Sequence, residues 1–187
     1  MQTMNMVLCG LGGQGILFMT KVVAQAALDK GFKVMGAETH GMAQRGGSVV
    51  SHLRIGEVQS SLVRTGSAQF LLALEENEGY RNLPFLSKGA GMFVNGDPDR
   101  FPRDEAKGFL ETKGVHYHAM PVGKIAQELG APRSANLALL GFFSAFDGFM
   151  VHADALRETL GRISPERFRE ANLKVFDTCH EKGVKSR

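Results

Sequence analysis

The run Gly10-Leu11-Gly12-Gly13-Gln14-Gly15, placed between two apolar segments, is the feature that most limits how this chain can fold. The segment before it, Met4 to Cys9, is a short apolar run typical of a buried strand. After it, apolar residues recur at helical spacing from Ile16 to Lys30, and Gly31 ends the pattern. A second strand is predicted over Phe32 to Ala37, so the chain is expected to open with a βαβ unit. The glycine turn would then lie at the carboxyl edge of a parallel sheet, where ligands commonly bind.

A second glycine-rich segment, Glu38 to Ser48, follows the turn at a distance of about one βα unit. It carries acidic, imidazole, amide and guanidinium side chains between glycines that let a ligand approach the backbone. Such a composition does not build a core, so the two segments together predict one binding site. Arg45, a permanent cation with a planar donor fork, is the expected contact for a phosphate or carboxylate. The candidate ligand-binding residues are Gly12, Gly13, Gln14, Gly15, Glu38, His40, Gly41, Gln44, Arg45, Gly46, Gly47 and Ser48.

The rest of the chain predicts an α/β fold with three layers, in which helices flank a mostly parallel, Rossmann-like sheet. A strand is expected over Ser48 to Ile55, where the alternation of residues leaves one face partly polar. Further strands are expected over Phe70 to Leu74, Met92 to Val94 and Val115 to Ala119. Residues 96 to 108 have no period and predict a surface connection, whereas the last third of the chain predicts helices.

Two helices of the last third have recognisable boundaries. Ser134 to Phe146 is apolar nearly all round, so this helix is expected against the sheet or in an interface, with Gly141 permitting a close neighbour. Ser164-Pro165-Glu166 predicts the N-cap, the first position and an acidic first turn of a helix that continues to about Glu181. Because no repeat or change of composition marks a boundary, residues 1–187 are expected to form a single domain.

Composition and charge exclude several classes of protein. With 187 residues, of which 43% are hydrophobic and 22% charged, the chain can bury a sizeable core without disulfides. A net charge of +3, with Lys and Arg scattered along the chain, argues against a nucleic-acid partner. Cys9 and Cys179 cannot supply the four ligands that an iron–sulfur cluster requires. Neither a signal peptide nor an apolar run long enough to cross a membrane is recognisable, so a cytoplasmic location is expected.

The glycine turn also satisfies G-x-G-x-x-G, the pattern of dinucleotide-binding turns. Glu38 sits near the place of the acid that binds the ribose in such proteins, so a stand-alone nicotinamide or flavin oxidoreductase is an alternative. Against it, Gln14 stands where these turns more often carry a small or apolar residue, and no hydride-transfer constellation follows. A structural alternative stays open for the second segment, in which Arg45 pairs with Glu38 and Gln44 bonds to the loop backbone.

Three further polar groups have structural explanations. His116 and His118 would share one strand face, but no third ligand accompanies them, so no metal site is predicted. Asn136, inside an apolar helix, is expected to be a hydrogen-bonded buried amide rather than a ligand contact. Asn95-Gly96-Asp97 is expected to be a turn, because the later Asn pair of a thiamine diphosphate motif is missing. No nucleophile stands beside a base, so no catalytic residue is predicted.

In the order of its two glycine segments and of the strand Ser48 to Ile55 that follows, the chain resembles the gamma subunit of 2-oxoacid:ferredoxin oxidoreductases. This subunit corresponds to the beta subunit of indolepyruvate ferredoxin oxidoreductase. The segment from Gly41 to Ser48, at its distance behind the turn, is the most specific part of the resemblance. The likeness spans almost the whole chain, through Gly66-Ser67-Ala68, Leu71 to Glu75, Val94-Asn95, Pro121-Val122, Pro132 to Asn136 and Glu170 to Lys174.

The resemblance implies a subunit of a complex that oxidatively decarboxylates a 2-oxoacid, forms an acyl-CoA and passes electrons to ferredoxin. Thiamine diphosphate, Mg²⁺ and the iron–sulfur clusters would belong to partner chains, and ferredoxin would be met through those chains. The two glycine segments would help enclose the 2-oxoacid or CoA, with Arg45 as the anion contact and with Gln44 and His40 as orienting groups. The isolated chain would be inactive and could pair with a second copy. A purely structural assembly subunit is the remaining alternative.

Overall fold

The computed structural model describes residues 3–41 and 46–187 of the chain. Its strands are β1 (Met4–Leu11), β2 (Val34–His40), β3 (Ser48–Ile55), β4 (Ala68–Ala73), β5 (Leu86–Asn95) and β6 (His116–Met120). Its α-helices are α1 (Ile16–Asp29), α2 (Glu76–Arg81), α3 (Asp104–Thr112), α4 (Val122–Glu128), α5 (Ala135–Ser144), α6 (Ala153–Ile163) and α7 (Glu166–Lys185). Two short 3-10 helices, η1 (Leu83–Phe85) and η2 (Pro132–Ser134), precede β5 and α5. Each predicted strand is present. β2 begins and ends later in the chain than predicted, and β5 begins earlier and is longer than predicted.

The six strands form one sheet in the order β2-β3-β1-β4-β5-β6. β1, β4, β5 and β6 run parallel, while β3 is antiparallel to both of its neighbours, β1 and β2. β2 therefore runs in the direction of β1, as a βαβ unit requires, but β3 is inserted between them. The mostly parallel sheet is confirmed, and the two strands of the predicted βαβ unit are not adjacent, because β3 returns from β2 and pairs with β1.

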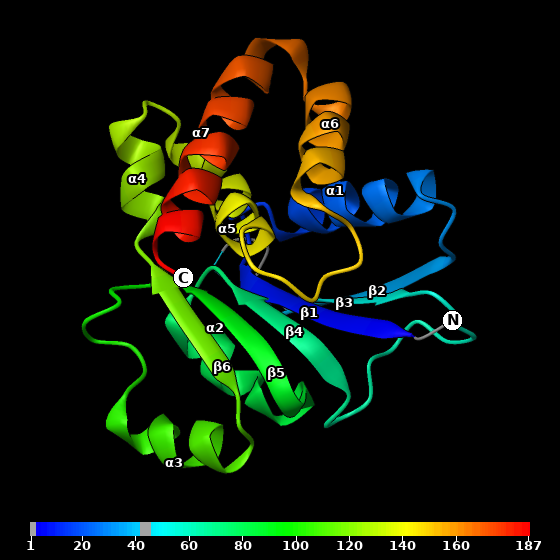
Figure 1. The fold of residues 1–187 in the computed structure, drawn as a ribbon, viewed down its shortest axis with the longest axis vertical. Coiled ribbons are helices and arrows are strands. Elements are labelled where there is room, and N and C mark those ends of the chain that lie inside the picture. Colours follow the sequence, from blue (N-terminus) through cyan, green and yellow to red (C-terminus); the bar gives the residue numbers. More distant parts are fainter. Residues whose placement is uncertain (1–2, 42–45) are drawn as a thin grey trace.

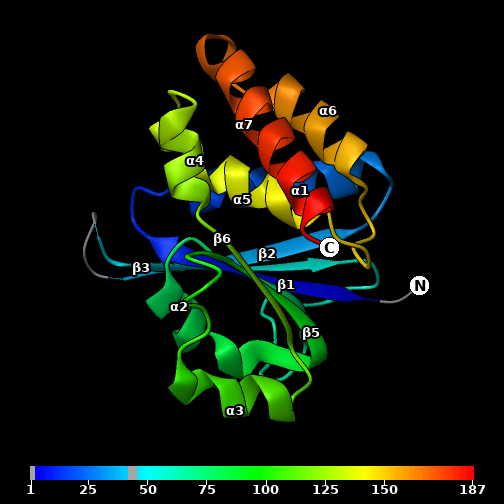
Figure 2. The ribbon, with the colours of Figure 1, turned by 60° about the vertical axis from the view of Figure 1, so that its left-hand side comes forward.

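Helices cover both faces of the sheet and give the three predicted layers (Figure 1). α1 and α4 to α7 lie on one face, and α2 and α3 lie on the other (Figure 2). Alternate residues of the central strands contribute to two different cores, with Leu8 and Leu72 on the α5 side and Val7 and Leu71 on the opposite side. Because both faces of β1 and β4 are covered, these strands read as unbroken apolar runs. The helical last third of the chain is also confirmed.

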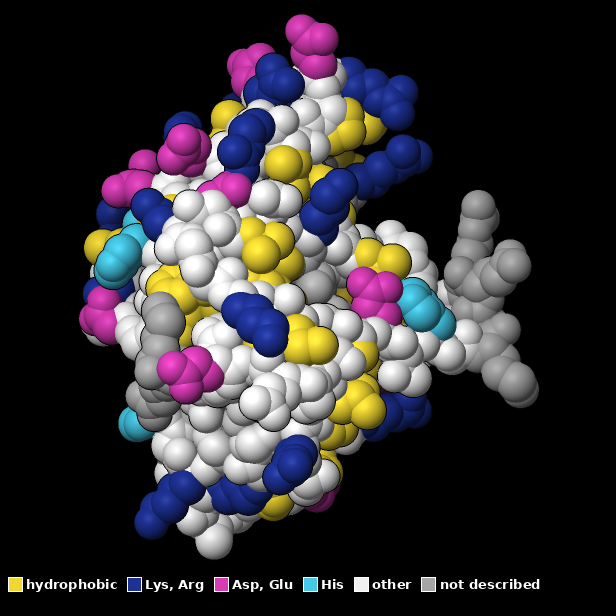
Figure 3. All heavy atoms as spheres, turned by 90° about the vertical axis from the view of Figure 1, so that its right-hand side faces the viewer, with side chains coloured by type: hydrophobic (Ala, Val, Ile, Leu, Met, Phe, Trp, Pro, Cys, Tyr) yellow, Lys and Arg dark blue, Asp and Glu magenta, His cyan; other side chains and the backbone are white. Residues whose placement is uncertain are grey.

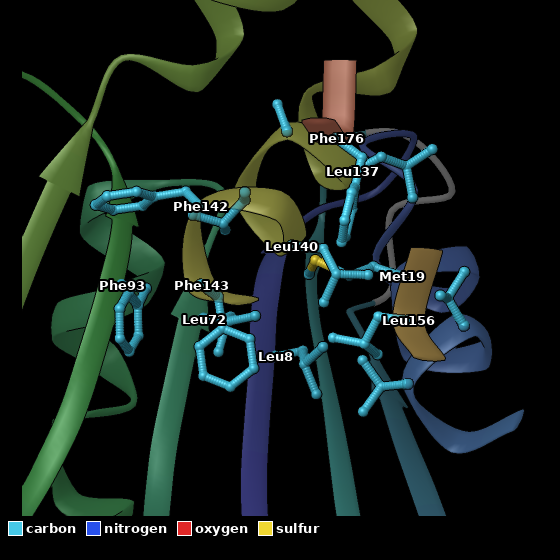
Figure 4. Close-up of a cluster of buried hydrophobic side chains, with 14 of the residues drawn as sticks. Leu8, Met19, Leu72, Phe93, Leu137, Leu140, Phe142, Phe143, Leu156 and Phe176 are labelled. Atoms are coloured by element: carbon cyan, nitrogen blue, oxygen red, sulfur yellow. The ribbon is translucent and has the colours of Figure 1, made fainter. Parts of the chain in front are cut away.

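α5 is the central helix of the larger core and lies between the sheet and α7 (Figure 4). All its residues from Asn136 to Phe143 are buried. The ring of Phe143 packs edge-on against that of Phe93 in β5, with 5.0 Å between centroids. On the other side, a Cβ added to Gly141 would lie 2.2 Å from the carbonyl oxygen of Phe176 in α7. The close neighbour predicted at Gly141 is therefore confirmed, and it is the backbone of α7.

α3 begins at Asp104, inside the segment 96–108 that the sequence predicts as a surface connection. Asp97 does make a turn, since its side-chain Oδ1 accepts a hydrogen bond of 3.0 Å from the backbone N–H of Asp99. The prediction is wrong for the last residues of the segment. Among the α3 residues only Leu110 is buried, so the helix has a weak apolar period, and its acidic first turn is its clearer signal.

The start of α7 also differs from the prediction. Pro165 is the N-cap residue, and no side chain caps the helix. The hydroxyl of Ser164 instead accepts a hydrogen bond of 3.1 Å from Nδ2 of Asn172, so the predicted role of Ser164 is wrong. The helix continues past Glu181 to Lys185. Although α7 has 20 residues, no helix that the structure describes combines the length and apolar composition needed to cross a membrane.

Candidate functional site

The two glycine-rich segments meet at the carboxyl edge of β1. Leu11, the last residue of β1, pairs with Ser48, the first residue of β3. Beyond this pair, the N–H of Gly12 donates to the carbonyl of Gly47 at 2.8 Å, and the N–H of Gly46 donates to the carbonyl of Gly12 at 3.4 Å. The glycine turn and the end of the β2–β3 connection are therefore one hydrogen-bonded unit.

Gln14 fixes the shape of the turn with both ends of its side chain. Its Oε1 accepts a hydrogen bond of 2.8 Å from the N–H of Leu11, and its Nε2 donates to Oε1 of Glu75 at 2.6 Å. Glu75 is the N-cap residue of α2, just beyond the end of β4. Because both the oxygen and the nitrogen of the side-chain amide are hydrogen-bonded, Gln14 stabilises the turn and connects it to the residues that follow β4.

Ser48 is held in the same way by a carboxylate that sequence reasoning missed. Its hydroxyl donates to Oε2 of Glu78 at 2.6 Å, and Oε1 of Glu78 accepts from Arg81 at 2.7 Å. Glu78 is 2% exposed, whereas the side chain of Arg81 is 70% exposed. The acidic run that follows the apolar strand of β4 was the available signal, since residues after parallel strands gather at one sheet edge.

A cavity of about 630 Å³ opens beside this hydrogen-bonded unit. Five candidate residues line it, namely Gly12, Gly13, Gly15, His40 and Gly41, and the side chains of Phe18 and Val49 add apolar wall. Gly15, the N-cap residue of α1, has a left-handed φ of 79°, and no side chain caps the helix. The unpaired N–H groups at such a helix start can bind a phosphate or carboxylate. The cavity therefore suits a ligand that has an anionic group and a less polar portion.

Glu38 and His40 lie within β2, not in a loop after it. Both are exposed, and 3.6 Å separates Oε2 of Glu38 from Nε2 of His40. Because β3 separates β2 from β1, Glu38 lies two strand spacings, about 10 Å, from the strand that carries the turn. The ribose-binding acid of a dinucleotide site ends the strand next to the turn, so this order disfavours the dinucleotide alternative. Gln44 and Arg45, and with them the alternative Arg45–Glu38 ion pair, lie outside the described residues.

His116 and His118 lie on β6, far along the sheet from the glycine turn. The ring of His118 stacks on Phe93 with 5.2 Å between centroids and lies 4.2 Å from the ring of Phe146. Burial lowers the pKa of His118, and the nearby His116 lowers it further. Across residues 3–41 and 46–187, no group of three His, Cys, Asp or Glu side chains could hold a metal ion. The contacts of His118 are those of a packing residue.

Two asparagines fix backbone near the carboxyl edge. Oδ1 of Asn95 accepts from the N–H of Gly123 at 3.0 Å, and its Nδ2 donates to the carbonyl of Leu74 at 3.3 Å. Nδ2 of Asn136 donates to the carbonyl of Gly15 at 2.9 Å, which links α5 to the start of α1. Oδ1 of Asn136 has no hydrogen-bond partner among the described residues. The buried amide predicted at Asn136 is therefore confirmed for its amino group only.

The two cysteines are buried in different cores. Burial raises the pKa of Cys179 to about 11, although Lys182 acts against the shift. Burial also raises the pKa of Cys9, and the negative charge of Glu78 adds to that effect. Iron–sulfur clusters are held by thiolates, which these surroundings disfavour. Cys9 and Cys179 therefore do not fit a cluster.

Comparisons with known proteins place this chain in a family. The family model described as pyruvate ferredoxin/flavodoxin oxidoreductase matches residues 5–182. The chain belongs to this family. Subunit IorB of indolepyruvate oxidoreductase from Methanothermobacter thermautotrophicus is a similar member, 34% identical over 183 residues that cover 92% of this chain and 93% of IorB. IorB from Thermococcus kodakarensis is also 34% identical, and that match covers 100% of this chain and 96% of the relative.

Some relatives are longer and match this chain over only part of their own length. Subunit VorA of ketoisovalerate oxidoreductase from Methanothermobacter marburgensis is 28% identical over 91% of this chain but only 34% of its own.

Solved structures share the fold of this chain. The keto/oxoacid ferredoxin oxidoreductase gamma subunit from Geobacter sulfurreducens has the same fold, with a TM-score of 0.77, 24% identity and coverage of 97% of this chain and 99% of its own. The 2-oxoglutarate:ferredoxin oxidoreductase of Magnetococcus marinus also gives a TM-score of 0.77, at 21% identity, with 99% of this chain and 32% of its own.

Proposed function

We propose that this chain is a subunit, without a redox centre of its own, of a 2-oxoacid:ferredoxin oxidoreductase. The complex would oxidatively decarboxylate a 2-oxoacid, form an acyl-CoA and pass electrons to ferredoxin. The observation that carries the proposal is the 34% identity to IorB, a subunit of indolepyruvate oxidoreductase, over nearly the full length of both chains. Indolepyruvate is accordingly the first substrate to test. The cytoplasmic location stays a prediction, which cell fractionation would check.

The cofactors of the reaction would lie in partner chains. Two buried thiols in separate cores do not fit an iron–sulfur cluster, which supports placing the clusters elsewhere. The acid-poor cavity beside the glycine turn is suited to an anion instead of Mg²⁺, which prefers carboxylate and water ligands. Thiamine diphosphate and Mg²⁺ would therefore be held by a partner, and this chain would contribute a wall of the shared active site.

In this proposal, the glycine-turn cavity helps to enclose the 2-oxoacid or CoA. Its uncapped helix start would face an anionic group, and Phe18 and Val49 would contact a less polar part of the ligand. His40, which lines the cavity from β2, would orient the ligand by hydrogen bonding. Arg45 and Gln44 follow His40 closely in sequence and would add the anion contact and a second orienting group.

Anaerobic purification of the tagged chain from its own cell extract tests the proposal directly. We expect co-purification of partner chains that hold iron and thiamine diphosphate, together with CoA-dependent oxidation of indolepyruvate. Substitution of pyruvate, 2-oxoglutarate and branched 2-oxoacids in the same assay would define the substrate. A chain that emerges alone with a bound nucleotide, and without this activity, would support the dinucleotide-binding alternative.

The anion contact can be tested with an Arg45→Ala variant of the complex. A lost charge-assisted hydrogen bond should raise KM for CoA or for the 2-oxoacid by about tenfold or more. Arg100→Ala is the matched control, because Arg100 is an exposed arginine on the connection between β5 and α3. Normal assembly with unchanged KM for both ligands would contradict the contact.

A purely structural subunit is the second candidate, and the contacts of Gln14 and Ser48 favour it. Both side chains are bonded to carboxylates of the α2 region, so part of the predicted ligand set serves the fold. If this alternative holds, neutral replacements of His40 and Arg45 should leave both assembly and kinetics unchanged. If the active-site proposal holds, the same variants should assemble but lose affinity for a ligand.

A further inference from the structure

The sheet has two edge strands, β2 and β6, each with a neighbouring strand on one side only. β2 is the longer of the two, with seven residues against five in β6. It pairs with β3 in one continuous register from Val34 to His40. It contains neither proline nor lysine, which natural proteins often place on edge strands to prevent pairing. β2 is therefore an edge at which another strand could add to the sheet.

Hydrogen bonds at both ends of β2 show which of its residues have backbone groups free to pair. The N–H of Gly41 donates to the carbonyl of Ser48 at 2.7 Å, and the carbonyl of Lys33 accepts from the N–H of Gly56 at 2.9 Å. Hydrogen-bonded positions alternate along an antiparallel pair, so the odd-numbered residues of β2 bond to β3. The even-numbered residues direct their N–H and C=O groups outward, and no hydrogen bond joins these groups to another described residue.

Two of the even-numbered residues, Glu38 and His40, carry ionisable side chains. These side chains are 42% and 51% exposed, and Oε2 of Glu38 lies 3.6 Å from Nε2 of His40. The β2 edge faces the viewer in Figure 3, where an acidic side chain and a histidine lie side by side. An acid and an imidazole two positions apart match a strand that presents the same groups in reverse order. A second copy of β2, running antiparallel, is such a strand.

The charges also select the register of this pairing. Among antiparallel registers centred within residues 37–40, one places opposite groups across the interface. With Thr39 opposite its own copy, Glu38 faces His40 of the second copy and His40 faces Glu38, and a Thr–Thr pair is favourable. With Glu38 opposite its own copy, two carboxylates face each other, which is destabilising. With Ala37 opposite its own copy, neither ionisable side chain faces a charged group.

Apolar surface accompanies the polar pair. His40 pairs with Val49, which belongs to the core beneath α1, so the His40 side chain lies on the α1 side of the sheet. Leu17 of α1 is 42% exposed and lines the glycine-turn cavity together with His40. Hydrophobic side chains are also exposed across the middle of the view in Figure 3. A strand added along β2 would cover part of this surface, which stabilises a pairing that two strands alone support weakly.

We propose that β2 pairs antiparallel with β2 of a second copy of this chain, about a two-fold axis at Thr39. The two sheets of six strands then become one sheet of twelve. Glu38 of each copy exchanges backbone hydrogen bonds with His40 of the other copy, and the four side chains alternate acid and imidazole around the axis. The pairing requires only this edge, so it holds whether or not the chain acts in an oxidoreductase complex.

Analytical ultracentrifugation of the full-length chain tests the association. We expect a monomer–dimer equilibrium, and a chain that stays monomeric up to about 1 mM would overturn the proposal. Amide exchange of the ¹⁵N-labelled chain, measured at low and high concentration, locates the interface. Dimer formation should slow exchange at Glu38 and His40, but not at Ala37 and Thr39, which already bond to β3. A dimer without this alternating protection would also overturn the proposal.

His40→Glu is the first variant, because it places two carboxylates opposite each other on both sides of the axis. Its dissociation constant should be about tenfold higher or more than that of the unmodified chain. His116→Glu is the matched control, since His116 is an exposed histidine on the other edge strand. Equal effects of the two substitutions would reduce the association to net charge and contradict pairing through β2.

A second variant with the opposite charge makes the test independent of any loss of folding. The double variant Glu38→Lys, His40→Lys should also be monomeric, because its edge repels its own copy. An equimolar mixture of this variant with His40→Glu should form a heterodimer, because every introduced lysine then faces a carboxylate. Homodimers that persist in both variants, or a mixture that does not associate, would overturn the proposal.

Discussion

Replacement of Gly141 by alanine would test how tightly α5 and α7 are packed. The added Cβ would lie 2.2 Å from the carbonyl oxygen of Phe176 and 2.9 Å from its carbonyl carbon and Cα, so the obstacle is backbone. Restoring ordinary contact requires the helices to separate by about 1 Å. Overpacking of this kind costs about 3 kcal/mol at the upper end of its range. Alanine recovers about 1 kcal/mol in helix propensity, so we expect a net loss of about 2 kcal/mol.

Thermal unfolding followed by circular dichroism would measure this loss. A decrease of about 2 kcal/mol should lower Tm by about 4–8 °C for a chain of this length. Gly108→Ala is the matched control, since Gly108 lies within α3 and a Cβ there would meet nothing within 4 Å. This control should be stabilised by about 0.5–1 kcal/mol. A Gly141→Ala protein as stable as the control would refute the packing argument.

Three other measurements test different parts of the molecule. Glu78→Ala should lower the free energy of unfolding by about 1–3 kcal/mol, because the Ser48 hydroxyl loses its buried acceptor. Arg81→Ala should lower it by less than about 1 kcal/mol, because the Arg81 side chain is largely exposed. Urea denaturation measures both losses, and losses of similar size would contradict this difference. Alkylation of Cys179 at pH 8 should be at least about 100-fold slower in the native chain than in denaturant, since burial raises its pKa to about 11, and equal rates would show that the thiol is accessible. Because the pKa of His118 is lowered by burial in the folded chain, the unfolded chain binds the proton first, and the free energy of unfolding should fall as pH decreases below about 6.5. A His118→Gln variant should have a flatter pH dependence in that range, and an unchanged slope would be evidence against the assignment.

Local patterns in the sequence were sufficient for the elements and layers of the fold. The apolar runs at β1 and β4 predict strands that are covered on both faces, and Gly141 predicts a close neighbour, without identifying the segments that provide these contacts. The position of β3 in the strand order could not be predicted from such local patterns. Alternation along Ser48 to Ile55 predicts a strand, but the same alternation is compatible with a parallel or an antiparallel neighbour. Strand order depends on pairing between distant segments.

The candidate site was predictable as a location more than as a set of contacts. The two glycine segments were expected together, and the hydrogen bonds that Gly12 makes with Gly46 and with Gly47 join them. The sequence could not reveal that the side chains of Gln14 and Ser48 are bonded to Glu75 and Glu78, because those partners lie at the start of α2 and within it, 61 and 30 residues further along the chain. In the sequence, a polar residue in a glycine-rich loop looks the same whether it binds a ligand or stabilises the fold.

The insertion of β3 between β1 and β2 also sets the order of events during folding. Leu11 and Ser48, whose pairing brings the glycine segments together, are separated by α1 and β2, so their contact must wait until this whole stretch has been synthesised and closed into a loop. Until then, neither side of β1 has a neighbour, because β4 follows β3 in the chain, and the turn lacks the bonds that Gly46 and Gly47 supply. A nascent chain that ends before β3 carries the complete glycine motif and the helix that follows it, but not the site.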